Sequence, residues 1–127
     1  MNVVAQVLAV LVGLTIIAVG VIEAFFYRNP RFFSILRIRP EDTGAVRLWT
    51  VNQGFENMIW GAGLLLGVVL LNVGDPVMGS TLVYFVCIAH VLLGIVLGFS
   101  EPKLWKSSIL QSLPPLLVIV AALALPA

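Results

Sequence analysis

Residues 50–61 read TVNQGFENMIWG and lead directly into the apolar run GAGLLLGVVLL of residues 61–71. Together with the residues before it, the run is long enough to cross a membrane as one helix, which takes about 20 apolar residues. The same helix carries four polar side chains near its start, namely Asn52, Gln53, Glu56 and Asn57. Such side chains are costly in hydrocarbon and usually face other helices or a functional path. The stretch therefore predicts a membrane span that contains a polar cluster.

The composition of the 127-residue chain also indicates an integral membrane protein. Hydrophobic residues make up 61% and charged residues only 10%, whereas a soluble domain is about half apolar and about a quarter charged. The net charge of +1 gives no support for nucleic acid as a partner. The single cysteine, Cys87, lies in an apolar run and is predicted to be a small buried hydrophobe.

Four segments are long and apolar enough to span a membrane: residues 3–26, 48–71, 81–99 and 108–125. Their connections are short, so neighbouring helices are expected to run antiparallel. The predicted fold is all-α, a four-transmembrane-helix antiparallel bundle that forms one membrane domain over residues 1–127.

The basic residues predict the direction of the spans. All seven lie in the loops 27–47 and 100–107, as Arg28, Arg31, Arg37, Arg39, Arg47, Lys103 and Lys106. Basic loops stay in the cytoplasm, so these loops are expected inside and both termini outside a bacterial cytoplasmic (inner) membrane.

The loop 27–47 contains PRFFSILRIRP, in which apolar and basic residues are mixed between two prolines. The segment either lies at the headgroup boundary or is an ordinary basic loop that sets the topology. Pro40, followed by Glu41 and Asp42, is typical of a helix start. The second long helix is therefore expected to begin near Pro40 and to protrude from the membrane.

A depth count places the polar side chains in two layers. With the inner boundary near Tyr27, Arg47, Ser100 and Ser107, a rise of about 1.5 Å per residue gives each depth. The shallow layer, about 6–8 Å deep, contains Glu23, Asn52, Gln53 and Gln111. The deeper layer, about 13–15 Å deep and close to the membrane midplane, contains Glu56, Asn57 and His90.

Helical spacing suggests which faces point inward. One face of the second span carries Trp49, Asn52, Glu56, Trp60, Gly63 and Gly67. Comparable stripes are His90, Gly94 and Gly98 on the third span and Gly13, Ile16, Gly20, Glu23 and Tyr27 on the first. Small residues let membrane helices approach closely, as in GxxxG pairs. The polar residues on these stripes, Glu23, Asn52, Glu56 and His90, are therefore expected to face the bundle axis.

The fourth span contains Pro114 and Pro115, which cannot donate to the carbonyls of Leu110 and Gln111. This break is either a kink for packing or the opening of a cavity on the cytoplasmic side.

The predicted site for a ligand or a proton pathway comprises Glu23, Asn52, Gln53, Glu56, Asn57, Trp60, His90 and Gln111. It either binds the head of a small amphiphile or passes a proton or small solute. Alternatively its side chains only form interhelical hydrogen bonds, and the protein is an accessory subunit of a larger membrane complex. A lipid-modifying enzyme is a further alternative, although no G-x-S-x-G or comparable signature is present and no catalytic residue is assigned.

Two carboxylates and an imidazole, from Glu23, Glu56 and His90, are a chemically possible metal-ligand set, but their spacing is not that of a metal motif. No metal or cofactor is therefore expected. Glu56 either stays protonated or pairs with a protonated His90. The expected partners are membrane lipid and either a second copy of the chain or a larger complex.

Three motifs, EAFFYRNPRFFSIL at residues 23–36, NQGFEN at 52–57 and LQSLPPLL at 110–117, carry a family resemblance. The chain resembles the bacterial domain-of-unknown-function family numbered 1304, which implies a small four-span membrane protein without an assigned activity. The pattern positions are Glu23, Phe26, Pro30, Arg31, Asn52, Gln53, Gly54, Phe55 and Asn57. Glu56 occupies a position more often aromatic or small in that family, so the resemblance favours Glu23, Asn52, Gln53 and Asn57 as the shared residues.

Overall fold

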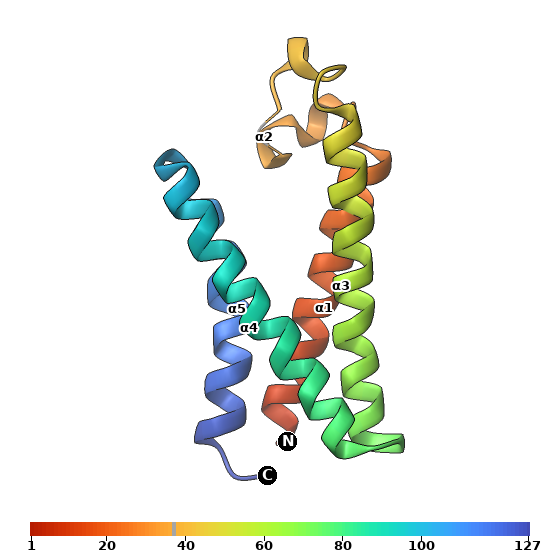
Figure 1. Ribbon diagram of the computed structural model, residues 1–127, viewed down its shortest axis with the longest axis vertical. Coiled ribbons are helices and arrows are strands. Elements are labelled where there is room, and N and C mark those ends of the chain that lie inside the picture. The colour runs from red at the N-terminus through yellow and green to blue at the C-terminus, as the bar shows by residue number, and fades with distance from the viewer. Residues whose placement is uncertain (37) are drawn as a thin grey trace. The chain divides into compact units, whose positions relative to one another are not determined.

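The computed structural model describes residues 1–36 and 38–127, and the described part is helical without strands (Figure 1). Arg37, one of the seven basic residues, lies outside the described residues. Four helices are long: α1 (Val3–Phe25), α3 (Arg47–Val73), α4 (Pro76–Ser100) and α5 (Trp105–Ala124). The short elements are η1 (Pro30–Phe32), α2 (Phe33–Leu36), η2 (Pro40–Asp42) and η3 (Pro102–Leu104). The all-α prediction is confirmed for these residues.

Four helical segments are long and apolar enough to cross a membrane, as predicted. The largest difference in bounds is at α4, which begins at Pro76 rather than at residue 81. The Asp75 side chain accepts hydrogen bonds from the backbone N–H groups of Val77 and Met78, and Pro76 occupies the first turn. An aspartate cap followed by proline is a strong helix start, so the helix extends back to the loop.

The contacts within the chain divide it into two compact units. Unit 1 comprises residues 1–13 and 63–127, and unit 2 comprises residues 14–62. Both α1 and α3 contribute residues to each unit.

In unit 2, the backbones of α1 and α3 touch at two glycines. A Cβ atom added to Gly20 would lie 2.5 Å from the carbonyl oxygen of Gly54, and one added to Gly54 would lie 2.5 Å from the nitrogen of Ala24. Next to this crossing, the rings of Phe25 and Phe55 pack edge to face, with 5.6 Å between their centroids. Such close approach between helices requires residues without side chains, and it maximises van der Waals contact.

The packed face of α3 differs from the predicted one. Within unit 2, its buried residues are Thr50, Gly54 and Gly61, which follow helical spacing. The predicted inward stripe lies mostly on the surface: Trp49 is 72% exposed, and Asn52 and Glu56 are exposed. The packed face is displaced by about one residue, which rotates it by about 100° around the helix.

The connection between α1 and α3 begins with capped turns. Asn29 caps η1 by accepting from the backbone N–H of Arg31, and Arg28 donates from Nε to the Tyr27 hydroxyl at 2.8 Å. Pro40 starts the turn η2, whose acidic residues follow the predicted pattern, but this is a single 3₁₀ turn. The long helix itself begins at Arg47, so the prediction of a helix start near Pro40 holds only for that turn.

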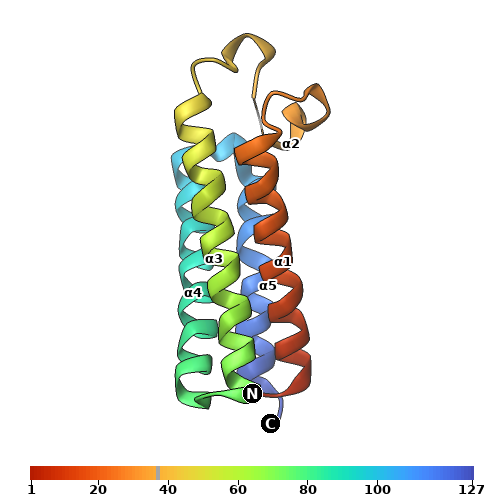
Figure 2. The same cartoon turned by 90° about the vertical axis from the view of Figure 1, so that its right-hand side faces the viewer.

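In unit 1, α4 and α5 lie side by side and run in opposite directions (Figure 2). The Ser108 hydroxyl donates to the Gly94 carbonyl at 2.6 Å, and the Ser112 hydroxyl donates to the Val91 carbonyl at 3.1 Å. Gly98 also faces Ser108. The glycine pair of the third span therefore provides the predicted close approach, with serines of α5 opposite it.

Of the second predicted glycine pair, Gly63 and Gly67, only Gly67 packs closely against another helix. A Cβ on Gly67 would lie 3.0 Å from the Gly79 carbonyl oxygen, so Gly67 contacts α4 within unit 1. Gly63 has open space around it and makes no close helix contact. Glycine is common in membrane helices for several reasons, and the GxxxG spacing alone does not select the contacting face.

The fully buried side chains of unit 1 include Leu64, Val83, Cys87 and Val118. Cys87 is thus a small core residue, as predicted. Asn2 caps α1 by accepting from the Ala5 N–H at 2.9 Å, and its amide donates to the Ala121 carbonyl at 2.8 Å.

Replacing Gly54 with alanine is expected to destabilise the protein by about 1–3 kcal/mol, because the new methyl group would overlap the α1 backbone. Thermal unfolding in detergent, followed by circular dichroism, measures the change. Gly63→Ala is the matched control on the same helix. It is expected to leave stability unchanged or slightly raised, since its methyl group enters open space. Equal destabilisation by both variants would contradict the assigned helix crossing.

Candidate functional site

A side-chain hydrogen bond joins the two long helices of unit 2, and it involves the predicted acid of α1. Asn57 on α3 donates from Nδ2 to Oε1 of Glu23 at 2.6 Å. Both side chains are half-buried. The Gly20–Gly54 crossing brings the two helix backbones close enough for these short side chains to meet. A hydrogen bond in which the acceptor is a carboxylate is stronger than one between neutral groups.

The second oxygen of the Glu23 carboxylate has no hydrogen-bond partner among the described residues. A carboxylate offers about four acceptor positions, and Asn57 uses one of them. Glu23 therefore keeps capacity to accept hydrogen bonds from another molecule, while Asn57 holds its first oxygen in place.

The same hydrogen bond sets the register of the two helices. Glu23 is four residues before Tyr27, and because the helices run antiparallel, Gln53 lies about level with Tyr27. The six residues from Arg47 to Gln53 then extend about 9 Å beyond that level. Figure 2 shows the first turns of α3 reaching past the end of α1.

This register corrects the two predicted layers for the residues of unit 2. Glu23 was expected in the shallow layer and Asn57 in the deep one, but they are bonded to each other. The depth count failed because it started α3 at Arg47 on the same boundary as Tyr27. Counted from Gln53 instead, Glu56 is about 4–5 Å inside the Tyr27 level, not 13–14 Å.

Asn52 and Glu56 do not take part in the Glu23–Asn57 pair. Asn52 is exposed, and its amide donates to the Leu48 carbonyl of its own helix at 2.7 Å. Glu56 is exposed on the same surface of α3. Within unit 2, the face of α3 that packs against α1 is the one with Gly54 and Asn57, and the expectation that Asn52 and Glu56 face the bundle axis stays a prediction. Gln53 and Trp60 are half-buried.

The remaining predicted site residues, His90 and Gln111, belong to unit 1. His90 is 4% exposed, and its Nδ1 lies 3.0 Å from the Val86 carbonyl oxygen, so Nδ1 carries the proton in that hydrogen bond. Gln111 is half-buried on α5, next to Ser112. Their membership of a common cluster with Glu23 stays a prediction.

Some polar contacts were not predicted from the sequence. In unit 1, Asn72 donates to Oε1 of Gln6 at 2.7 Å, beside a groove of about 440 Å³ lined mainly by valines. The hydroxyls of Ser108 and Ser112 bond to backbone carbonyls of α4. The sequence feature that could have predicted the serine contacts is the four-residue spacing of Ser108 and Ser112, which matches that of Gly94 and Gly98 on the preceding helix.

The described residues contain no group of three or more His, Cys, Asp or Glu side chains that could hold a metal ion. In the same part of the chain, every buried side-chain nitrogen or oxygen has a hydrogen-bond partner. The chemical property that this site offers is the capacity of the Glu23 carboxylate to accept further hydrogen bonds.

The described residues form an all-helical fold, and four of its helices are long and apolar enough to cross a membrane. A family described as "Protein of unknown function (DUF1304)" matches residues 10–123, and the chain belongs to this family. Neither a curated protein nor a solved structure matches the chain.

Replacing Asn57 with leucine is expected to lower the stability of the protein by about 0.5–2 kcal/mol, because it removes the hydrogen bond to Glu23. Thermal unfolding in detergent provides the measurement. Asn52→Leu makes the same chemical change on the same helix and is expected to have an effect within about 0.5 kcal/mol, since Asn52 bonds only to its own helix. A larger loss from Asn52→Leu than from Asn57→Leu would show that the pair has been misassigned.

Proposed function

We propose that the protein is an integral membrane protein of the bacterial cytoplasmic membrane, with its four long helices in an antiparallel bundle and both termini outside. The lengths and apolar composition of the helices support the spans. The seven basic residues, all between the first and second or the third and fourth spans, support the orientation. The Tyr27–Arg28 pair supports a membrane boundary at the end of α1, because aromatic and basic side chains prefer that region.

This topology predicts opposite labelling of two cysteine variants in whole cells by a membrane-impermeant maleimide. Pro126→Cys at the C-terminus should react directly, and Gly44→Cys in the first basic loop should react only after permeabilisation. The wild-type chain is the blank, since Cys87 is buried. Direct labelling of Gly44→Cys in intact cells would overturn the orientation.

We further propose that unit 2 binds the polar head of a small amphiphile at Glu23. The observation that supports this is the half-buried carboxylate with one oxygen bonded to Asn57 and the other available as an acceptor. The complementary head is an ammonium or another group that donates hydrogen bonds, since an ionised carboxylate only accepts. Binding of this kind requires neither a metal nor a nucleophile.

The surroundings of Glu23 suit an apolar tail. Phe25 is 62% exposed, and Phe55 and Ile59 on α3 are 48% and 72% exposed. With Tyr27 at the boundary, Glu23 lies about 6 Å inside the hydrocarbon. At this depth the head of an amphiphile reaches the carboxylate while its tail stays among lipid chains.

A second candidate, a subunit of a larger membrane complex, is favoured by the exposed polar face of α3. Asn52 and Glu56 lie on this face, and Gly63 further along the helix is open. A partner helix could approach Gly63 closely and satisfy the two polar side chains.

The binding proposal predicts that dodecylammonium raises the thermal stability of the detergent-solubilised protein, whereas an uncharged dodecyl maltoside of equal chain length does not. At a free ligand concentration 100 times the dissociation constant, binding raises the free energy of unfolding by about 2.7 kcal/mol. Glu23→Gln, which retains an oxygen for Asn57, should weaken binding at least tenfold. Glu56→Gln is the matched control and should bind as the wild type does. Undiminished binding by Glu23→Gln would exclude this site.

A stoichiometric larger partner found after purification in mild detergent, and lost in Glu56→Gln, would instead favour the subunit candidate. Native mass spectrometry separates the outcomes by mass.

A further inference from the structure

A second surface feature lies in unit 1, at the start of α5. It is a groove of about 310 Å³ lined by Trp105, Lys106, Ile109, Leu110, Leu113 and Pro114. The lining is apolar apart from the Lys106 ammonium, and the groove is therefore open to an apolar molecule along most of its length.

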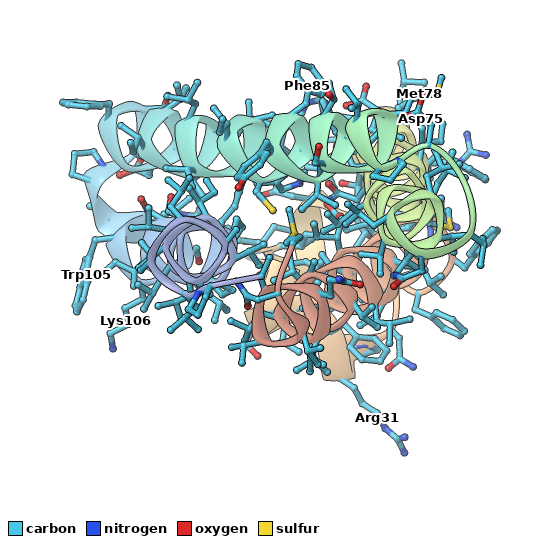
Figure 3. The ribbon with its side chains drawn as sticks, turned by 90° about the horizontal axis from the view of Figure 1, so that it is seen from below. Arg31, Asp75, Met78, Phe85, Trp105 and Lys106 are labelled. Atoms are coloured by element: carbon cyan, nitrogen blue, oxygen red, sulfur yellow. The ribbon has the colours of Figure 1, made fainter. Side chains whose placement is uncertain are left out.

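The two residues at the head of the groove interact with each other. The Nζ atom of Lys106 lies 5.6 Å from the centre of the Trp105 ring, and both side chains project from the same side of α5 (Figure 3). A cation over an indole ring is attracted by the ring's electrons. The contact places the ammonium of the exposed Lys106 beside Trp105 at the head of the groove.

The spacing of the lining residues gives the groove a direction. They follow one face of α5 over ten residues, from Trp105 to Pro114, and the nine steps between these two residues span about 13–14 Å. This is close to half of the roughly 30 Å hydrocarbon thickness, and thus to the depth of one leaflet. Trp105 is 56% exposed and Leu110 is 76% exposed, so no other residue of unit 1 covers this face.

From this geometry we infer that the groove is a binding site for an anionic phospholipid of the cytoplasmic leaflet. Lys106 contacts the phosphate, Trp105 lies at the level of the glycerol backbone, and one acyl chain follows Ile109, Leu110 and Leu113. The charge is complementary: Lys103 adds a second positive charge in the turn before α5, and with the Glu101 carboxylate that caps this turn the local net charge is still positive. The groove contains no residue of unit 2, and the proposal requires only that α5 spans the membrane.

The test uses the full-length chain with Trp49→Phe and Trp60→Phe, so that Trp105 is the sole tryptophan. The protein is reconstituted in phosphatidylcholine vesicles that contain 20% phosphatidylglycerol, and either lipid is brominated on its acyl chains at the same mole fraction. Brominated chains quench a tryptophan that they touch. Brominated phosphatidylglycerol should be enriched at Trp105 about fivefold over brominated phosphatidylcholine.

Lys106→Gln should reduce this enrichment to near unity, while Lys103→Gln, which does not line the groove, should retain most of it. Circular dichroism checks that each variant is folded. Equal quenching by both lipids in the parent chain would overturn the proposal. An equal loss in both lysine variants would also overturn it, because it would show only a diffuse surface charge. Displacement of the lipid by inorganic phosphate would reassign the groove to a free anion.

Discussion

The hydrogen bond from Asn57 to Glu23 is the constraint on which the structure of unit 2 depends. It can form only where α1 and α3 come into backbone contact, and the Gly20–Gly54 crossing provides that contact. Once the bond is made, neither helix can slide without leaving a carboxylate and an amide unpaired in an apolar environment, which is costly. The bond therefore fixes both the register and the rotation of α3.

The fixed register explains how an apolar chain accommodates the polar stretch around Asn52 and Glu56. With Gln53 level with Tyr27, the proposed span of α3 runs from about Gln53 to Val73, close to the length that crosses the hydrocarbon. Glu56 is then about one turn inside the boundary, where a carboxylate can extend towards water. A charged group at the midplane would cost at least about 2.5 kcal/mol, and this placement avoids most of that cost.

Several features were predictable from local sequence. Hydropathy predicted the four long helices, whereas proline with acidic residues predicted a helix start near Pro40, where only the 3₁₀ turn η2 forms. Register and rotation were not predictable, because they depend on which glycines meet across helices. The second span has glycines on more than one face, at Gly54, Gly61, Gly63 and Gly67, and helical spacing alone did not single out Gly54, which packs against α1. Of the predicted site, Glu23 and Asn57 come together, whereas the predicted partners on α3, Asn52 and Glu56, lie on its surface.

The central claim, that α3 enters the membrane near Gln53 and not at Arg47, can be measured by electron paramagnetic resonance in vesicles. A spin label is attached to Glu56→Cys or to Gly63→Cys, both on open surface, and its depth is determined from its accessibility to oxygen and to a water-soluble nickel complex. The account predicts that the label at position 63 lies near the midplane and is deeper than the label at position 56. A label at position 56 that lies deeper than the one at position 63 would contradict it.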